Sequence, residues 1–389
     1  MEQKVVLKDY LKKYGETSFK EMALNEVDIL VLAALCYADY MAIPNVINKY
    51  DIWNGRIPLS DFKDHAVMKK LSKRYLSGQL NYYNFFREVL ETKRFEPLRI
   101  TKIRNIFSKS KNTQFFAMVY EIYNMRFVIF RGTDNTIPGW KEDFLTALGN
   151  EIPSQKLASE YLNDILNENT KHKYYIIGHS KGGNMAYYAF FNLKDELKDR
   201  IIKCYNLDGN GFKNDNFPYA KYNDRLKKIV PNDDVVGCVF DTYNGNTIVK
   251  TCSYSIWAHD VLTWQLNLGD YTKLLEVQSL KRVSLAFKIV FNSWIMKMSL
   301  KELIDFIDFI FVLVDLEKTK TINELFKNLY KNRHAYLQTI KNYPTDRKKV
   351  IKRLTAKFLR DYIKVYIKLL PISKRLSLIL NKKKFIEEE

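Results

Sequence analysis

The sequence predicts an α/β fold with a mostly parallel central sheet and helices on both of its faces. Between residues 101 and 270, short runs rich in β-branched and aromatic residues alternate with segments of helical periodicity, which is the pattern of a parallel sheet. Residues 1–100 and 271–389 are dominated by helical periodicity. We therefore expect an N-terminal helical segment (1–100) packed on an α/β core (101–270), followed by a helical C-terminal extension (271–389).

The composition indicates a folded chain whose charge is unevenly distributed. Its 389 residues are 47% hydrophobic, which is enough to bury a sizeable core. Lys and Arg number 63 against 44 Asp and Glu, and residues 271–389 hold 26 of the former and 12 of the latter. The C-terminal region is therefore strongly basic. The sequence offers no uninterrupted apolar run of the roughly 20 residues that a transmembrane helix needs.

The N-terminus and the cysteines favour a cytoplasmic protein. Residues 1–12 lack the apolar stretch of a secretory signal. The four cysteines lie far apart without a Cys-x-x-Cys pair, so we expect reduced and mostly buried thiols. The five histidines form neither a His-Glu-x-x-His motif nor a Cys/His cluster, so we expect no metal and no cofactor.

Local patterns place the elements in order along the chain. Asn25 is a good cap for a helix whose apolar positions recur at helical spacing from Val27 onward and that ends before Pro44. Two β-rich runs predict a hairpin that turns at Asn124. Strands are expected at 114–123, 126–130, 173–177, 201–207, 226–230 and 247–252. Helices are expected at 158–166, 182–193, 285–298, 301–316, 322–330 and 347–370.

The sharpest local signal is Gly178-His179-Ser180-Lys181-Gly182, a Gly-x-Ser-x-Gly pattern between a predicted strand and a predicted helix. That context is typical of a nucleophile elbow, in which a serine occupies a strained strand-to-helix turn and flanking glycines let neighbouring chains approach. A plain glycine-rich turn is the structural alternative. A phosphate-binding loop is excluded because Gly-Lys-Ser/Thr is absent.

Acyl transfer also needs donors for the oxyanion and a base for the serine. The strand that ends in Gly132-Thr133 precedes the elbow, so the N–H groups of Thr133 and Lys181 are the expected oxyanion hole. In enzymes with a nucleophile elbow, the catalytic histidine follows the serine in the sequence. Of the two later histidines, His334 lies in the basic helical region and His259 follows the last predicted strand in a loop. We expect His259 to be the base.

Three carboxylates qualify as the acid that orients His259, because each follows a predicted strand after the elbow. Asp208 ends the first of these strands, and Asp233 and Asp234 follow the next one. Adjacent residues usually face different ways, so one of Asp233 and Asp234 is expected to be a solvated loop carboxylate.

With these residues in place, the chain resembles the class 3 lipases of the α/β-hydrolase fold, and more closely a bacterial group of uncharacterised lipase-like proteins. The resemblance spans about residues 20–270. It rests on these segments: 25–30, 114–117, 130–134 with 139–143, 178–186, 207–212, 231–237, and 259–260 with Trp264.

The resemblance implies Ser180 as nucleophile, His259 as base and an oxyanion hole at Thr133 and Lys181. It favours Asp234 over Asp233 as the acid, because the lipase acid is followed by two residues of which the second is usually valine. Asp208 then looks structural. Lys181 replaces a usual apolar residue, which hints at an anionic headgroup in the substrate. The implied function is a serine-dependent ester hydrolase of acyl lipids, of the lipase, phospholipase or lysophospholipase type.

The sequence does not decide what the basic helix expected at 347–370 contacts. Its basic and apolar residues recur side by side at helical spacing, which suits either an anionic membrane surface or packing on the body with a solvated lysine face. The sequence does not favour nucleic acid, because no nucleic-acid motif accompanies the charge. The C-terminal region is thus a lid, a cap or a membrane-surface element.

The expected partner is an acyl-ester lipid substrate, and the sequence leaves the oligomeric state open. Two alternatives to the lipid hydrolase remain at this point. One is a membrane-surface or nucleic-acid binding protein on a hydrolase scaffold. The other is a thioesterase or an acyltransferase, which would use the same triad chemistry.

Overall fold

A sheet of eight strands forms the centre of the computed structural model, which describes residues 4–75, 78–134, 136–149, 151–168, 171–316 and 322–372. The strands lie side by side in chain order, antiparallel from β1 to β4 and parallel from β4 to β8. They are β1 (Ile57–Pro58), β2 (Arg99–Ser108), β3 (Thr113–Ile122), β4 (Met125–Phe130), β5 (Tyr174–His179), β6 (Ile201–Leu207), β7 (Leu226–Pro231) and β8 (Asn246–Val249). The predicted α/β fold is confirmed.

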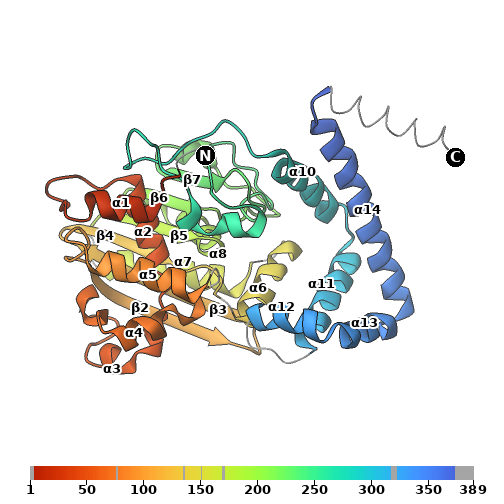
Figure 1. Ribbon diagram of the computed structural model, residues 1–389, viewed down its shortest axis with the longest axis horizontal. Coiled ribbons are helices and arrows are strands. Elements are labelled where there is room, and N and C mark those ends of the chain that lie inside the picture. The colour runs from red at the N-terminus through yellow and green to blue at the C-terminus, as the bar shows by residue number, and fades with distance from the viewer. Residues whose placement is uncertain are drawn as a thin grey trace.

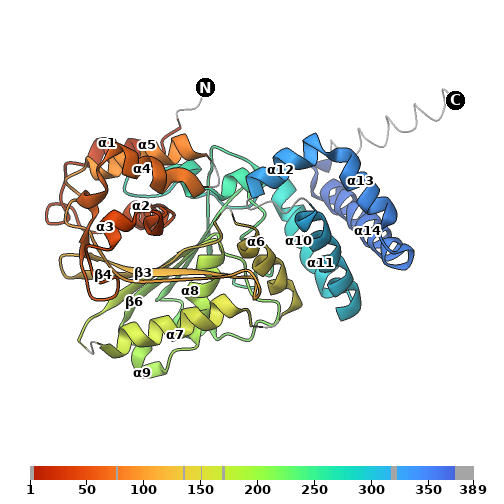
Figure 2. The ribbon, with the colours of Figure 1, turned by 90° about the horizontal axis from the view of Figure 1, so that it is seen from below.

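Helices cover both faces of the sheet (Figure 2). On one face lie α1 (Leu7–Tyr14), α2 (Glu26–Leu35), α3 (Pro44–Ile47), α4 (His65–Leu71) and α5 (Gln79–Leu90). On the other lie α7 (Pro153–Glu168), α8 (Lys181–Phe191) and α9 (Asp195–Lys198). Helices α7 to α9 connect parallel strands on one face and the N-terminal helices cover the other, so the sheet lies between two helical layers in an α/β architecture.

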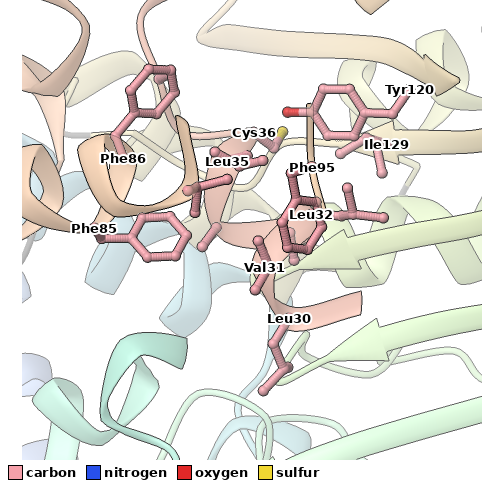
Figure 3. Packing of buried hydrophobic residues seen from close by; sticks show 14 of the residues in the cluster. Leu30, Val31, Leu32, Leu35, Cys36, Phe85, Phe86, Phe95, Tyr120 and Ile129 are labelled. Atoms are coloured by element: carbon pink, nitrogen blue, oxygen red, sulfur yellow. The ribbon is translucent and has the colours of Figure 1, made fainter. Parts of the chain in front are cut away.

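Helix α2 is the centre of the larger core. Asn25 caps it as expected, and its side chain accepts hydrogen bonds from the N–H groups of Val27 and Asp28. Every residue from Val27 to Leu35 is buried, between the sheet and the aromatic side of α5 (Figure 3). The helix is hydrophobic all round because it is enclosed by protein on all sides.

One buried ion pair ties this layer together. The Arg94 guanidinium contacts both carboxylate oxygens of Asp28, at 2.7 and 2.5 Å, and the Tyr10 hydroxyl donates to the same carboxylate at 2.7 Å. Arg94 and Asp28 are fully buried. Breaking such a pair by removing one partner typically costs about 3–5 kcal/mol, so the three residues fix α1 and α2 against the start of β2.

The C-terminal helices form a group beside the sheet (Figure 1). They are α10 (Arg282–Met296), α11 (Leu300–Asp315), α12 (Ile322–Lys331), α13 (Arg333–Asn342) and α14 (Thr345–Leu369). Helices α10 and α14 run antiparallel, because Trp294 donates to the Leu354 carbonyl at 3.0 Å and Tyr362 to the Val283 carbonyl at 3.3 Å. In the described part of the chain, no helix combines the length and apolar character that crossing a membrane requires.

Helix α11 connects this group to the body. Buried Val314 and partly buried Leu313 pack with Ile137 and Trp140 of α6 (Ile137–Leu145). Helix α6 follows the turn at Thr133, so the C-terminal region rests directly on a segment of the candidate site.

Candidate active site

The parallel strands bring the predicted residues to one edge of the sheet. Thr133 follows β4, Ser180 follows β5, Asp208 follows β6 and Asp234 follows β7. Carboxyl ends of neighbouring parallel strands meet at the same edge, where ligands of open α/β sheets bind. The topology therefore gathers side chains from Thr133 to Asp234, which lie 101 residues apart in the sequence.

Ser180 has the strained backbone of a nucleophile elbow. It lies between β5 and α8 with φ 60° and ψ −135°, a region that residues other than glycine rarely adopt. A Cβ added to Gly178 would lie 1.9 Å from the Gly182 carbonyl oxygen, and one added to Gly182 would lie 2.1 Å from that of Phe130. The glycines are required because the chains approach this closely, and the serine is presented at the tip of the turn.

His259 is paired with Asp208. It ends the short 3-10 helix η6 (Ser255–His259), and its Nδ1 lies 2.7 Å from Oδ2 of Asp208. A carboxylate only accepts, so Nδ1 carries the proton and Nε2 is left as the basic nitrogen. Asp208 is fully buried and has φ 52°, so its orientation is fixed by a strained backbone.

The expected partner of His259 was Asp234, and here the prediction and the geometry differ. Asp234 lies behind Asp208 and its Oδ2 accepts the N–H groups of Val236 and Gly237. Asp233 turns away and pairs with Lys281 at 2.7 Å. The Asp-x-x spacing of the lipase acid indicated Asp234. The hydrogen bond to His259 is instead made by Asp208, the residue with φ 52° that follows β6.

Burial strongly affects this cluster. It raises the pKa of both Asp208 and Asp234, and the charge of Asp208 raises the pKa of Asp234 further. Burial also lowers the pKa of His259, while the nearby carboxylates oppose that shift. Removal from water disfavours every charged form, so His259 is held neutral and ready to accept a proton.

A second histidine holds the first in place, and sequence reasoning did not single it out. His179 Nε2 lies 2.8 Å from the backbone carbonyl of His259 and must donate to it. Its Nδ1 therefore accepts from the Tyr37 hydroxyl at 2.7 Å. The two imidazole rings lie with centroids 4.5 Å apart. Its position within the Gly-x-Ser-x-Gly pattern was the only available signal.

The loop of His259 has another support from the N-terminal layer. Tyr75 donates to Asp260 Oδ1 at 2.5 Å, and the Tyr75 ring meets that of Tyr37 edge-on at 5.8 Å. Tyr75 thus holds Asp260 directly, and Tyr37 holds the His259 backbone through His179. Within the described residues no hydrogen bond joins the Ser180 hydroxyl to His259; such bonds often tighten only when substrate binds.

The turn expected to form the oxyanion hole lies against the elbow. A Cβ added to Gly132 would lie 2.8 Å from the Ser180 Cβ. The Thr133 hydroxyl donates to Asp143 at 2.7 Å, which assigns it to the protein rather than to a substrate. Across the described part of the chain, the N–H groups of Thr133 and Lys181 have no acceptor.

The Lys181 side chain points away from the site, which corrects the hint of an anionic headgroup. Its ammonium lies 2.7 Å from Glu142 Oε2 and 3.0 Å from the Gln114 carbonyl oxygen, and it is buried. Glu142 also accepts the N–H groups of Gln114 and Ser154. The lysine stands where lipases have an apolar residue because a buried carboxylate neutralises it.

One group of residues has metal-binding composition. Ligand atoms of Asp208, Asp234 and His259 lie within 4.8 Å of one another. Two ligands of one tetrahedral zinc ion are separated by about 3.3 Å, whereas His259 Nδ1 and Asp208 Oδ2 are 2.7 Å apart. The contact fits a hydrogen bond rather than a shared ion.

Comparisons with known proteins found a matching family model and similar chains of solved structure. It is similar to the Rhizomucor miehei lipase in its native propeptide complex (14% identity, 58% of this chain and 68% of that chain, TM-score 0.32). It is also similar to the Lip2 lipase of Yarrowia lipolytica (11% identity, 72% of this chain and 98% of that chain, TM-score 0.34). No curated protein matches it. Residues 89–312, more than half of the chain, match the Mbeg1-like family, and the chain belongs to that family.

Proposed function

We propose that the protein is a serine ester hydrolase with Ser180 as nucleophile, His259 as base and Asp208 as the orienting acid. The observation that carries the proposal is the 2.7 Å bond from His259 Nδ1 to buried Asp208 beside a serine at φ 60°. That bond leaves Nε2 unprotonated, and the elbow presents the serine at the same edge of the sheet. Together they supply an activated nucleophile.

The reaction follows from these roles. Ser180 Oγ attacks the ester carbonyl carbon and its proton passes to His259 Nε2, while Asp208 stabilises the imidazolium that forms. The carbonyl oxygen becomes an oxyanion, for which the N–H groups of Thr133 and Lys181 are the proposed donors. The C–O bond of the ester then breaks, and the leaving alcohol takes the proton from His259. Water next attacks the acyl-enzyme and gives its proton to His259, which returns it to Ser180 Oγ as the acid is released.

Acyl lipids are the proposed substrate class. The resemblance of the sequence motifs to those of class 3 lipases supports it. The Lys181 ammonium is bound to Glu142, so it gives no support for an anionic headgroup and the choice among lipase, phospholipase and lysophospholipase stays open. The cytoplasmic location and the narrower bacterial group stay predictions.

Hydrolysis of short and long acyl esters by wild type, Asp208→Asn and Asp233→Asn tests the acid assignment. We expect Asp208→Asn to lower kcat by roughly 10³–10⁴-fold, since His259 would take the wrong tautomer. Asp233→Asn is the matched control, because Asp233 pairs only with Lys281 in the described structure, and its activity should equal that of wild type. Equal activity of the three proteins would contradict the triad.

The thioesterase and acyltransferase alternatives share this chemistry. Thioester substrates, and an added acceptor alcohol in the ester assay, separate them from the hydrolase. A folded wild type that turns over none of these substrates would favour the binding protein on a hydrolase scaffold.

A further inference from the structure

Helix α14 carries an apolar surface that is exposed among the described residues. Its packed face lies on α10 and α11 through buried Ile351 and Leu354, with Val350 and Phe358 beside them. Opposite that face, Leu359, Ile363 and Ile367 are 53%, 56% and 39% exposed. They are four residues apart, so they form one stripe along the helix. Ile363 is nine residues from Leu354, which places the two side chains on opposite sides of the helix.

This stripe is flanked by positive charge. Helix α14 holds nine Lys and Arg against Asp346 and Asp361. Arg360, Lys364 and Lys368 border the stripe, are exposed, and make no ion pair within residues 322–372 or the other described ranges. A second apolar stripe beside basic residues is what a helix lying in an anionic lipid interface requires.

We propose that the C-terminal half of α14 binds an anionic lipid surface, with Leu359, Ile363 and Ile367 entering the acyl boundary and the basic residues contacting headgroups. Packing against the other described helices does not account for the stripe, because α10 and α11 cover the opposite face. Nucleic acid would be recognised by the charges alone and would leave the aliphatic residues in water.

The inference deepens the proposed lipid hydrolase, although binding can be measured without turnover. Helix α11 packs against both α14 and α6, and α6 follows the Thr133 turn. A protein held on lipid by α14 would therefore keep the catalytic edge near the layer that contains its substrate.

Sedimentation of the full chain with vesicles tests this surface. The wild type should bind phosphatidylglycerol-containing vesicles at least about tenfold better than pure phosphatidylcholine vesicles, and added salt should weaken the binding. Combined Leu359→Ser, Ile363→Ser and Ile367→Ser should reduce binding at least about tenfold. Ile52→Ser with Leu80→Ser, which removes exposed apolar residues far from α14, should bind as wild type does.

Two outcomes would overturn the proposal. One is vesicle binding that the α14 triple variant retains in full while circular dichroism shows it folded. The other is a wild type that does not sediment with anionic vesicles but binds polynucleotides, since the basic residues would then bind nucleic acid. Loss of esterase activity with intact vesicle binding would contradict the hydrolase and leave the lipid surface standing.

A second, independent inference concerns Asp234. Asp208 and Asp234 are both fully buried, and a carboxylate oxygen of each lies within 4.8 Å of the other. Their Oδ2 atoms are engaged by His259 and by backbone N–H groups. Their Oδ1 atoms are buried and have no hydrogen-bond partner within the described residues. Two adjacent carboxylates without solvent cannot both be ionised.

We infer that Asp234 holds a proton and donates it to Asp208, so that Asp208 alone carries the charge facing His259. Asp234 is then a positioning residue that fixes the carboxylate of Asp208 towards Nδ1. Other charged groups around the pair are Lys228 and Asp241, which bond each other at 2.7 Å. This inference rests on the proposed triad.

Asparagine mimics a protonated aspartic acid in shape and as a donor, which gives a direct test. Asp234→Asn should lower kcat by less than about tenfold, whereas Asp208→Asn should lower it by roughly 10³–10⁴-fold. Infrared difference spectra at neutral pH should show a carboxylic-acid C=O band in wild type that Asp234→Asn lacks.

The infrared band separates this inference from the proposed function, because it does not depend on turnover. A wild type without the band would overturn the shared proton whether or not the enzyme is active. Equal losses of kcat in Asp234→Asn and Asp208→Asn would also overturn it, since Asp234 would then be a charged acid in its own right.

Discussion

The Tyr37 hydroxyl lies 2.7 Å from Nδ1 of His179, and His179 holds the backbone of His259 through its other nitrogen. Tyr37 follows α2 and belongs to the N-terminal helical layer. That layer therefore does more than cover the sheet. It fixes the loop that carries the proposed base.

Replacing His179 with phenylalanine should weaken catalysis without unfolding the protein. The ring can still pack on His259, but both hydrogen bonds are lost and the His259 carbonyl is left buried without a donor, at a cost of about 1–3 kcal/mol. We expect kcat for ester hydrolysis to fall by roughly tenfold or more. His334→Phe, on the exposed side of α13, is the control, and equal rates for the two variants would contradict the role of His179.

The pH profile should reflect the burial of His259. Burial lowers the pKa of His259 below the ordinary value of 6.5, against the opposing charges of nearby carboxylates such as Asp260. The base works only when neutral, so kcat/KM should fall as the pH drops through a midpoint that lies below 6.5. Asp260→Asn removes one opposing charge and should move that midpoint lower still. A midpoint above 6.5 in wild type would contradict this account.

Gly132→Ala should disable the site. A Cβ at this position would lie 2.4 Å from the His179 carbonyl oxygen and 2.5 Å from the Tyr37 hydroxyl. The turn would have to move away from Ser180, and a displacement of about 1 Å can cost a hundredfold in rate. We expect a loss of that size in ester hydrolysis. Gly269→Ala, whose added Cβ would meet nothing closer than 3.4 Å, should behave as wild type.

The buried Lys181–Glu142 pair should matter for stability. Lys181→Met leaves Glu142 buried without its counter-charge, which should lower the free energy of unfolding by about 3–5 kcal/mol. The double variant Lys181→Met with Glu142→Gln should recover most of the loss. Urea unfolding of the three proteins measures both effects. A Lys181→Met variant as stable as wild type would show that the pair contributes nothing.

Much of the architecture follows from the sequence alone. The strand at 201–207 was predicted residue for residue, and β3 to β8 and α7, α8, α10, α11 and α14 lie within a few residues of their predicted bounds. Apolar runs bounded by turn residues carry that information locally. Strand β2 was missed because Arg99, Lys102 and Arg104 interrupt its apolar pattern, and a bulge between Thr101 and Arg104 shifts its register.

The site was only partly predictable, because its decisive features depend on three-dimensional neighbours. Ser180, His259, Thr133 and Lys181 were named from motif and order, and all four lie at the same sheet edge. The choice between Asp208 and Asp234 depends on which side chain projects towards His259, and spacing does not encode that. Likewise, only the fold reveals that the Lys181 ammonium faces Glu142 and that α14 has a second apolar stripe.

Reaction of wild type and Ser180→Ala with a fluorophosphonate probe, read by intact mass, tests the central claim most directly. The probe reports an activated serine without any knowledge of the substrate. We predict one adduct on wild type and none on Ser180→Ala. A folded wild type that remains unlabelled, or an adduct that persists in Ser180→Ala, would contradict the assignment of Ser180 as the nucleophile.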